Sequence, residues 1–126
     1  MSADQLAMLL RNAALPRSGL KKIAISTLEG YELVQATDII RCESDSNYTT
    51  IYLKGNTKIV ASKTLKDIEE LLEEHSFFRV HHSHLVNLNE INKYVKGDGG
   101  YLVMSDQSTV NVARSRKDAL LNFFAA

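Results

Sequence analysis

Apolar and polar residues alternate over short stretches of this chain, such as residues 22–27. The alternation is clearest over residues 48–53, where Thr49, Ile51 and Leu53 would share one face. Successive side chains of a strand point to opposite faces, so this spacing predicts β-structure. Short polar breaks such as Gly55-Asn56 are typical of hairpin turns. Strands are therefore expected over residues 22–27, 31–35, 39–43, 48–53, 57–61, 77–81, 90–96, 101–104 and 109–112.

The segment 62–75 has a helical period instead. Thr64 and Asp67 are placed to cap its N-terminus. Its apolar stripe consists of Leu65, Ile68, Leu71 and Leu72. The opposite face carries Glu69, Glu70, Glu73 and Glu74, which are expected to be solvated. Weaker patterns predict terminal helices over residues 2–12 and 114–124.

The connections between the strands are too short for crossover helices, which favours antiparallel pairing. Residues 44–47 and the histidine-rich stretch after residue 81 are expected to be polar loops. The expected fold class is therefore mainly β with helices (α+β). A length of 126 residues fits one domain. Pro16 and Gly19 are expected to separate a linker or tail helix, residues 1–20, from a domain over residues 21–126.

The composition narrows the functional classes. Fifteen Lys and Arg balance fifteen Asp and Glu, so the chain is no simple polycation. Residues 76–126 carry six cations against four anions, which allows a mildly basic face. A single cysteine, Cys42, excludes an internal disulfide and is typical of a reducing compartment. No apolar run approaches the roughly 18 residues of a membrane span and no signal-peptide pattern opens the chain, so a cytoplasmic protein is expected.

Three histidines within four positions, His81, His82 and His84, raise the question of a metal centre. Zinc is bound by His, Cys and carboxylate ligands at short spacings. On a strand, however, His82 and His84 would face one side and His81 the other, so a third ligand would have to come from elsewhere. A metal-dependent hydrolase centred on these residues stays an alternative. Cys42 in its apolar strand is expected to be a buried, inert thiol, and we expect no enzyme, no catalytic residue, no metal and no cofactor.

Four consecutive residues, Arg114-Ser115-Arg116-Lys117, place three cations at the start of a predicted helix. The helix dipole favours anions at this end, and a phosphate partner would account for the clustering. A β-rich module that binds another protein through an exposed sheet edge is the second alternative.

The sequence Phe-Phe-Arg-Val-His-His-Ser-His-Leu-Val-Asn-Leu-Asn-Glu-Ile, residues 77–91, resembles the signature of the LytTR DNA-binding domain. The likeness extends in order and spacing from about residue 22 to residue 124. Residues 38–51, 62–72 and 110–115 also resemble the family. Ala113 stands where the family often carries a serine, which affects a hydroxyl contact and not the fold.

The resemblance implies an elongated domain of small antiparallel sheets with a packed central helix and a C-terminal helix. It implies the DNA-binding domain of a bacterial transcriptional regulator that reads promoter direct repeats with loops in the major groove. Such domains are usually output halves of two-component response regulators, so a receiver domain and its histidine kinase are implied partners. The domain is expected to be a monomer alone, to pair on DNA and to have no membrane partner. Asn87 is expected to hold the histidine loop by bonding main-chain atoms.

Carried over by position, three loops and two lysines would contact double-stranded DNA. Asn47 or Tyr48 would reach a base or a phosphate, and asparagine pairs well with adenine. His82 would face a base edge and Ser83 a phosphate. For His81 two roles are equally expected, a contact with DNA or support of the loop. In the third loop an arginine would pair with guanine. The implied contact residues are Asn47, Tyr48, His81, His82, Ser83, Lys96, Arg114, Ser115, Arg116 and Lys117.

Overall fold

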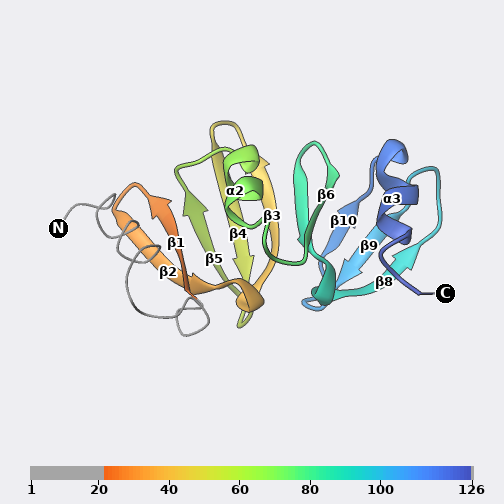
Figure 1. Ribbon diagram of the computed structural model, residues 1–126, viewed down its shortest axis with the longest axis horizontal. Helices are drawn as coiled ribbons and strands as arrows, with labels where there is room; N and C mark the ends of the chain where they lie inside the picture. Colours follow the sequence, from red (N-terminus) through yellow and green to blue (C-terminus); the bar gives the residue numbers. More distant parts are fainter. Residues whose placement is uncertain (1–21, 126) are drawn as a thin grey trace.

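The computed structural model describes residues 22–125, which form ten β-strands, two short α-helices and three 3-10 turns. Figure 1 shows an elongated molecule in which a two-stranded, a five-stranded and a three-stranded sheet follow one another along the long axis. All strand pairs are antiparallel. The fold class is mainly β with helices, as predicted. The linker helix predicted over residues 1–20 lies outside the described residues.

The two-stranded sheet is the hairpin of β1 (Lys22–Thr27) and β2 (Gly30–Gln35). Strand β1 is bonded to the segment that follows β5, and Val34 of β2 packs against the first core. The Ser62 N–H donates to the Ser26 carbonyl at 2.9 Å, and the two serine hydroxyls lie 3.1 Å apart. These bonds place β1 beside the end of the five-stranded sheet.

The five-stranded sheet has the order β5-β4-β3-β7-β6. Its central strand β3 has a register shift between Ile39 and Arg41. A bulge of this kind changes which face the following residues point to. Ile39 and Cys42 consequently pack into one core, and Ile40 packs into the other. The strand bounds are β3 Ile39–Asp45, β4 Tyr48–Leu53, β5 Thr57–Ala61, β6 Phe77–His81 and β7 His84–Asn87.

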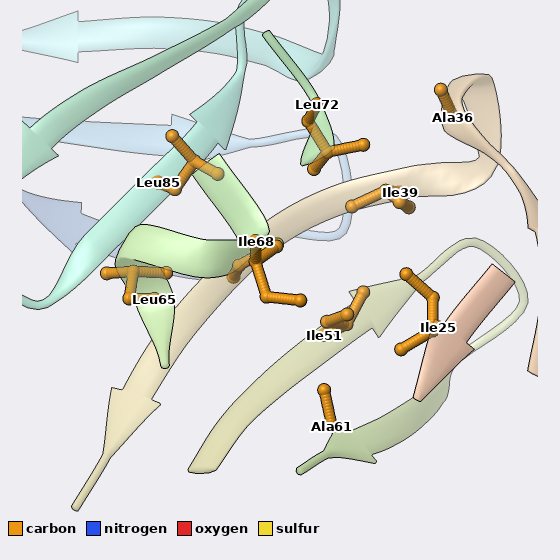
Figure 2. Close-up of a cluster of buried hydrophobic side chains, with 10 residues drawn as sticks. Ile25, Ala36, Ile39, Ile51, Ala61, Leu65, Ile68, Leu72 and Leu85 are labelled. Carbon is orange, nitrogen blue, oxygen red and sulfur yellow. The ribbon is translucent and has the colours of Figure 1, made fainter. Parts of the chain in front are cut away.

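The first core lies between one face of this sheet, the helix α2 (Leu65–Leu71) and β1 (Figure 2). The predicted cap is present, because the Thr64 hydroxyl accepts from the Asp67 N–H and the Asp67 carboxylate accepts from the Thr64 N–H. The buried residues are Ile25, Ala36, Ile39, Cys42, Ile51, Ala61, Leu65, Ile68, Leu72 and Leu85.

The second core lies between the other face and the three-stranded sheet, whose order is β10-β9-β8. The strands are β8 (Ile91–Val95), β9 (Tyr101–Met104) and β10 (Thr109–Asn111), and the helix α3 (Lys117–Leu121) adds Leu120. Phe123 packs edge-on against Phe78 of β6, with ring centroids 5.1 Å apart. The buried residues are Ile40, Val80, Val86, Leu102, Met104, Val110, Val112 and Leu120.

The central helix is shorter than the predicted 62–75 at both ends, and the residues before its start have other partners. The Ser62 N–H is bonded to β1, and the buried Thr49 hydroxyl donates to the Lys63 carbonyl at 2.8 Å. These bonds hold the residues before Thr64 outside the helix. Within residues 22–125, no helix has the length and apolar character that crossing a membrane requires.

Three further expectations need correction. Strand β3 continues through Ser44 and Asp45, which pair with β4, so the first polar loop is only the turn 46–47. Residues 84–87 form strand β7, which the sequence pattern did not predict. The C-terminal helix is preceded by a 3-10 turn, η4 (Arg114–Arg116), so the three cations begin on a tighter turn than expected.

Candidate nucleic-acid interface

Four connections meet along one edge of the molecule. They are the β3–β4 turn, the β6–β7 turn, the β8–β9 turn and the segment that leads from β10 into α3, all in the upper part of Figure 1. Antiparallel order brings them to this side, because every second turn of such a sheet lies at the same end of the strands. We call residues 45–48, 81–83, 96–100 and 113–117 the loop edge.

The first two turns are tied to each other through the main chain. The Ser44 N–H donates to the Ser83 carbonyl at 2.9 Å. The β3–β4 turn itself is tight, since Asp45 pairs with Tyr48 and Ser46 adopts a left-handed φ of 55°. Asn47 is therefore presented at the tip, and Tyr48 beside it is 39% exposed.

In the second turn, His81 and His82 differ in exposure and in hydrogen bonding. His82 is exposed, whereas His81 is half-buried and its Nδ1 accepts a hydrogen bond from the Ser83 N–H at 3.1 Å. Burial, together with the neighbouring His82 and Arg79, lowers the pKa of His81, which keeps this nitrogen free to accept. His81 is thus a support of the turn.

The expected alternation of the three histidines is wrong. The strand stops at His81 and resumes at His84, and these two residues pair across the turn with ring centroids 5.2 Å apart. A turn breaks the two-residue period on which the expectation relied. Within residues 22–125, no three His, Cys, Asp or Glu side chains are grouped to hold a metal ion.

The third segment is fixed beside the second. The Ala113 N–H donates to the Val80 carbonyl at 2.8 Å, which places Arg114 next to the end of β6. Arg114 is exposed, and its Nη2 lies 3.4 Å from the Asp98 carboxylate in the β8–β9 turn. Ser115 and Arg116 are also exposed, and Lys117 is half-buried at the start of α3.

The β8–β9 turn braces this segment. The Val112 N–H donates to the Gly100 carbonyl at 3.1 Å, and the Tyr94 hydroxyl donates to the Gly99 carbonyl at 2.7 Å. Lys96 is exposed on the same turn. All ten residues implied as DNA contacts therefore lie on the loop edge, although they come from four separate parts of the chain.

Comparison with known proteins decides the family. The model of the LytTr DNA-binding domain matches residues 29–125. The chain belongs to the LytTr DNA-binding domain family. A LytTr DNA-binding domain from Bacillus cereus has the same fold, with a TM-score of 0.69 and 22% identity over 81% of this chain and 94% of that one. These matches confirm the predicted family and fold.

Two relatives of this LytTr domain are heme-containing CO-sensing transcriptional regulators of Paraburkholderia xenovorans strain LB400. RcoM 2 is 37% identical over 100 residues, which cover 77% of this chain and 37% of that protein. RcoM 1 is 36% identical over 108 residues, which cover 83% of this chain and 40% of that protein. The LytTr chain thus spans about two fifths of the length of these regulators. Its family and relatives confirm the prediction of a DNA-binding domain of the kind that transcriptional regulators carry.

Sequence reasoning missed two charged residues that support the LytTr loop edge. Arg79 of β6 donates to main-chain carbonyls of the second turn and forms an ion pair with Glu69 of α2. Glu69 was expected to be a solvated helix residue, and its side chain is 43% exposed, but the expectation did not include its ion pair with Arg79. An arginine between apolar neighbours in Phe77–Val80, immediately before the histidines, was the available signal.

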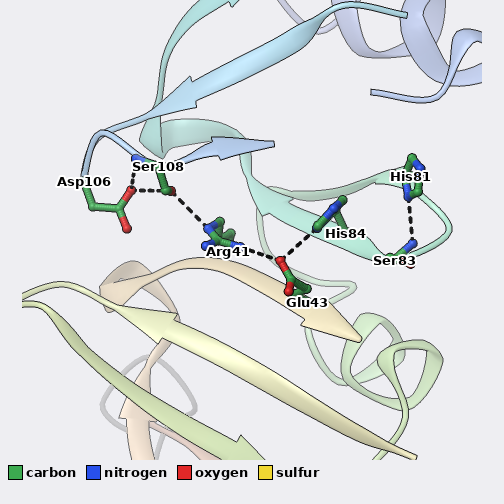
Figure 3. A network of polar contacts seen from close by, with 7 residues as sticks. All are labelled: Arg41, Glu43, His81, Ser83, His84, Asp106 and Ser108. Carbon is green, nitrogen blue, oxygen red and sulfur yellow. Dashed lines mark hydrogen bonds and ion pairs between the residues drawn. The ribbon is translucent and has the colours of Figure 1, made fainter. Parts of the chain in front are cut away.

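A second polar network joins the three-stranded sheet of the LytTr domain to its centre (Figure 3). Arg41 of β3 donates to the Ser108 hydroxyl at 3.0 Å and to the Glu43 carboxylate at 3.1 Å, and Ser108 is bonded to Asp106. The buried Nδ1 of His84 makes no hydrogen bond and lies 3.6 Å from Glu43. Burial lowers the pKa of His84, although the Glu43 charge acts in the opposite direction.

The single thiol of the LytTr domain is buried, as predicted. Cys42 is fully buried in the first core, and burial raises its pKa to about 12. Because the thiolate is the reactive form, we expect Ellman's reagent to leave Cys42 unmodified in the folded protein at pH 8 and to react once urea unfolds it. Reaction at the rate of a free thiol without denaturant would contradict this placement.

Proposed function

We propose that this LytTr domain reads double-stranded DNA with the loop edge, and that its turns enter successive segments of the major groove. The observation that supports the proposal is the convergence of three distant chain segments on one edge through the Ser44–Ser83 and Ala113–Val80 main-chain bonds. Such bonds keep exposed side chains at defined separations, which the reading of base edges requires.

The side chains at the tips are suited to bases. Asn47 can pair with adenine, and Arg114 or Arg116 can pair with guanine. His82 stands between them on the second turn and would face a base edge. The residues that flank the tips would bind phosphate or sugar, and these are Tyr48, Ser83, Lys96, Ser115 and Lys117.

We expect charge to contribute modestly to DNA affinity, because DNA must compete with an acidic side chain for Arg114. In the free domain Arg114 lies 3.4 Å from Asp98, and both side chains are largely exposed. Exposed ion pairs of this kind contribute little stability, so a DNA phosphate or a guanine can replace the carboxylate. We expect affinity to fall with added salt, though less steeply than for a strongly basic domain.

We further propose that the domain is the output part of a bacterial regulator that binds direct repeats in promoter DNA, one copy on each repeat. A receiver domain and its histidine kinase would supply the signal in a two-component regulator. A heme-based CO sensor is the second candidate, since RcoM 2 and RcoM 1 match this chain. Heme absorbance in the purified regulator would favour the second candidate, and phosphorylation of a receiver would favour the first.

The experiment that tests the proposal is a selection of random duplex DNA on the purified domain, read by sequencing, at two salt concentrations. Enrichment of a spaced direct repeat would support both the function and the pairing on DNA. Retention of DNA without enrichment of any sequence would contradict base reading by this edge. Absence of retention even at low salt would favour a protein-binding module instead.

Replacement of His82 or Arg114 by alanine should weaken binding to the selected sequence without unfolding the domain. Each good base contact contributes about 1–3 kcal/mol of discrimination, and both side chains are exposed, so the fold does not depend on them. Fluorescence anisotropy with the selected duplex and with a scrambled one would measure the effect.

The chain offers a matched control for each variant. His75 is an exposed histidine just before β6, and Lys58 is an exposed cation on β5 at the far end of β4 from Tyr48. His75→Ala and Lys58→Ala should keep the affinity of the unmodified domain. If the control variants lose as much discrimination as His82→Ala and Arg114→Ala, the contacts do not lie on the loop edge.

A further inference from the structure

The side chain of Arg79 binds main-chain carbonyls of the second turn, the β6–β7 turn. Its Nε donates to the His81 carbonyl at 3.0 Å, and its Nη2 donates to the His82 carbonyl. Both carbonyls belong to the turn, where β6 departs from regular pairing between Arg79 and His81. The guanidinium therefore gives the main-chain carbonyls of the turn a charged donor in addition to the pairing of His81 with His84.

The same guanidinium is anchored at its other side. Arg79 Nη1 lies 2.9 Å from the Oε1 atom of Glu69, and the Arg79 side chain is largely buried. The planar fork of arginine can bind a carboxylate and two carbonyls at once, whereas lysine has no such geometry. One side chain thus connects the main chain of the turn to α2.

The main chain of Glu69 lies in a helix that packs into the first core. Its neighbour Ile68 is buried in the first core together with Leu65 and Leu72, and the capping box of Thr64 fixes the first turn of α2. The helix therefore holds the main chain of Glu69 in place, and the ion pair with Arg79 holds its partly exposed carboxylate beside the second turn. The main-chain bond between Ser44 and Ser83 connects the second turn to the first, so a change in the orientation of the second turn would also move the first.

We infer that the Glu69–Arg79 pair positions the β6–β7 turn for DNA, so that sequence selectivity depends on an acidic residue of α2. The inference rests on the proposed function, in which His82 reads a base from this turn. Glu69 and Arg79 are positioning residues, because each acts on DNA through the main chain of His81 and His82. The proposal has an unusual consequence, since removal of a negative charge from a DNA-binding domain would normally strengthen binding.

The test compares Glu69→Gln with Glu70→Gln. Both variants remove one carboxylate from the same helix, but the Glu70 side chain is exposed and does not touch Arg79. We expect Glu69→Gln to lose about tenfold in affinity for the selected duplex, the effect of one good base contact, with unchanged or slightly higher affinity for scrambled DNA. Glu70→Gln should keep the selectivity of the unmodified domain.

Arg79→Lys supplies a second variant that preserves the charge. It should lose the same selectivity as Glu69→Gln, and the double variant should be no worse than either single one, because both changes break one unit. A partly exposed ion pair contributes little to global stability, so all variants should unfold at the same urea concentration. Equal selectivity of Glu69→Gln and Glu70→Gln would overturn the proposal.

Amide hydrogen exchange gives a readout that does not depend on DNA. The Ser83 N–H donates to His81 Nδ1, and we expect it to exchange faster in Glu69→Gln than in Glu70→Gln. If the unmodified domain binds no DNA while this difference is present, the proposed function fails and the positioning of the turn stands. If the domain binds selectively and neither exchange nor selectivity changes, the positioning inference fails alone.

Discussion

Replacement of Gly99 by alanine is expected to destabilise the domain by about 3 kcal/mol or more and to displace the third segment of the loop edge. A Cβ atom at this position would lie 1.9 Å from the Val112 carbonyl oxygen and 3.0 Å from the Arg114 nitrogen. Both are main-chain atoms, so no side-chain rotation can relieve the overlap. The β8–β9 turn would have to move away from the segment it braces. Urea unfolding followed by circular dichroism would measure the loss.

Gly97→Ala is the matched control, because it makes the same chemical change two residues earlier in the same turn. A Cβ atom there would come no closer than 3.5 Å to its neighbour, the Gly100 Cα. We expect its free energy of unfolding to stay within about 0.5 kcal/mol of the unmodified protein. Equal stability of the Gly99 and Gly97 variants would show that the turn does not pack against Val112. The Gly99 variant should also lose selective DNA binding, since Arg114 follows the displaced residues.

Replacement of Asn87 by alanine is expected to cost about 3 kcal/mol, because it leaves two main-chain groups unpaired at about 1–3 kcal/mol each. Asn87 is only 4% exposed. Its Nδ2 donates to the Ile39 carbonyl at 2.9 Å, and its Oδ1 accepts from the Asn89 N–H at 3.0 Å. The side chain thus joins the start of β3 to the 3-10 turn η3 (Leu88–Glu90) that leads into the three-stranded sheet.

Asn89→Ala separates this effect from the simple loss of an asparagine. The side chain of Asn89 is exposed, and its main-chain N–H is retained in the variant. Thermal unfolding should therefore show a large fall in Tm for Asn87→Ala and almost none for Asn89→Ala. A small fall for both would mean that the Ile39 carbonyl and the Asn89 N–H find other partners. Asn87 bonds main-chain atoms as predicted, but at the opposite end of β7 from the histidine turn it was expected to hold.

Much of the local structure could be predicted because it depends on neighbours in sequence. Strands β4 and β5 begin and end where the alternation of residues 48–53 and 57–61 predicts, and the capping box of Thr64 and Asp67 is present. Errors arose where a distant partner changed the outcome. Ser44 remains in β3 because it pairs with Thr49 of β4 and its N–H donates to the Ser83 carbonyl, and a polar residue by itself gives no sign of that.

The candidate contacts were predicted as separate loops, and the family signature was needed to name them. Periodicity could not show that Asn47, His82 and Arg114 lie on one edge, since 35 and 32 positions separate them along the chain. The role of Glu69 could not be predicted from periodicity either. It occupies a polar helix position that is ordinarily solvated, and only the approach of Arg79 from another element changes its role.

By itself, the sequence determined most of the strands, the capped helix, the mainly β fold class and the likeness to LytTR domains. These follow from side-chain spacing, turn residues and caps, which act over a few residues. Only the tertiary structure decided that the four connections form a single edge, that Gly99 must lack a side chain, and that Arg79 and Glu69 support the histidine turn. Those properties depend on main-chain bonds and charge pairs between distant segments, which exist only once antiparallel pairing has brought the segments together.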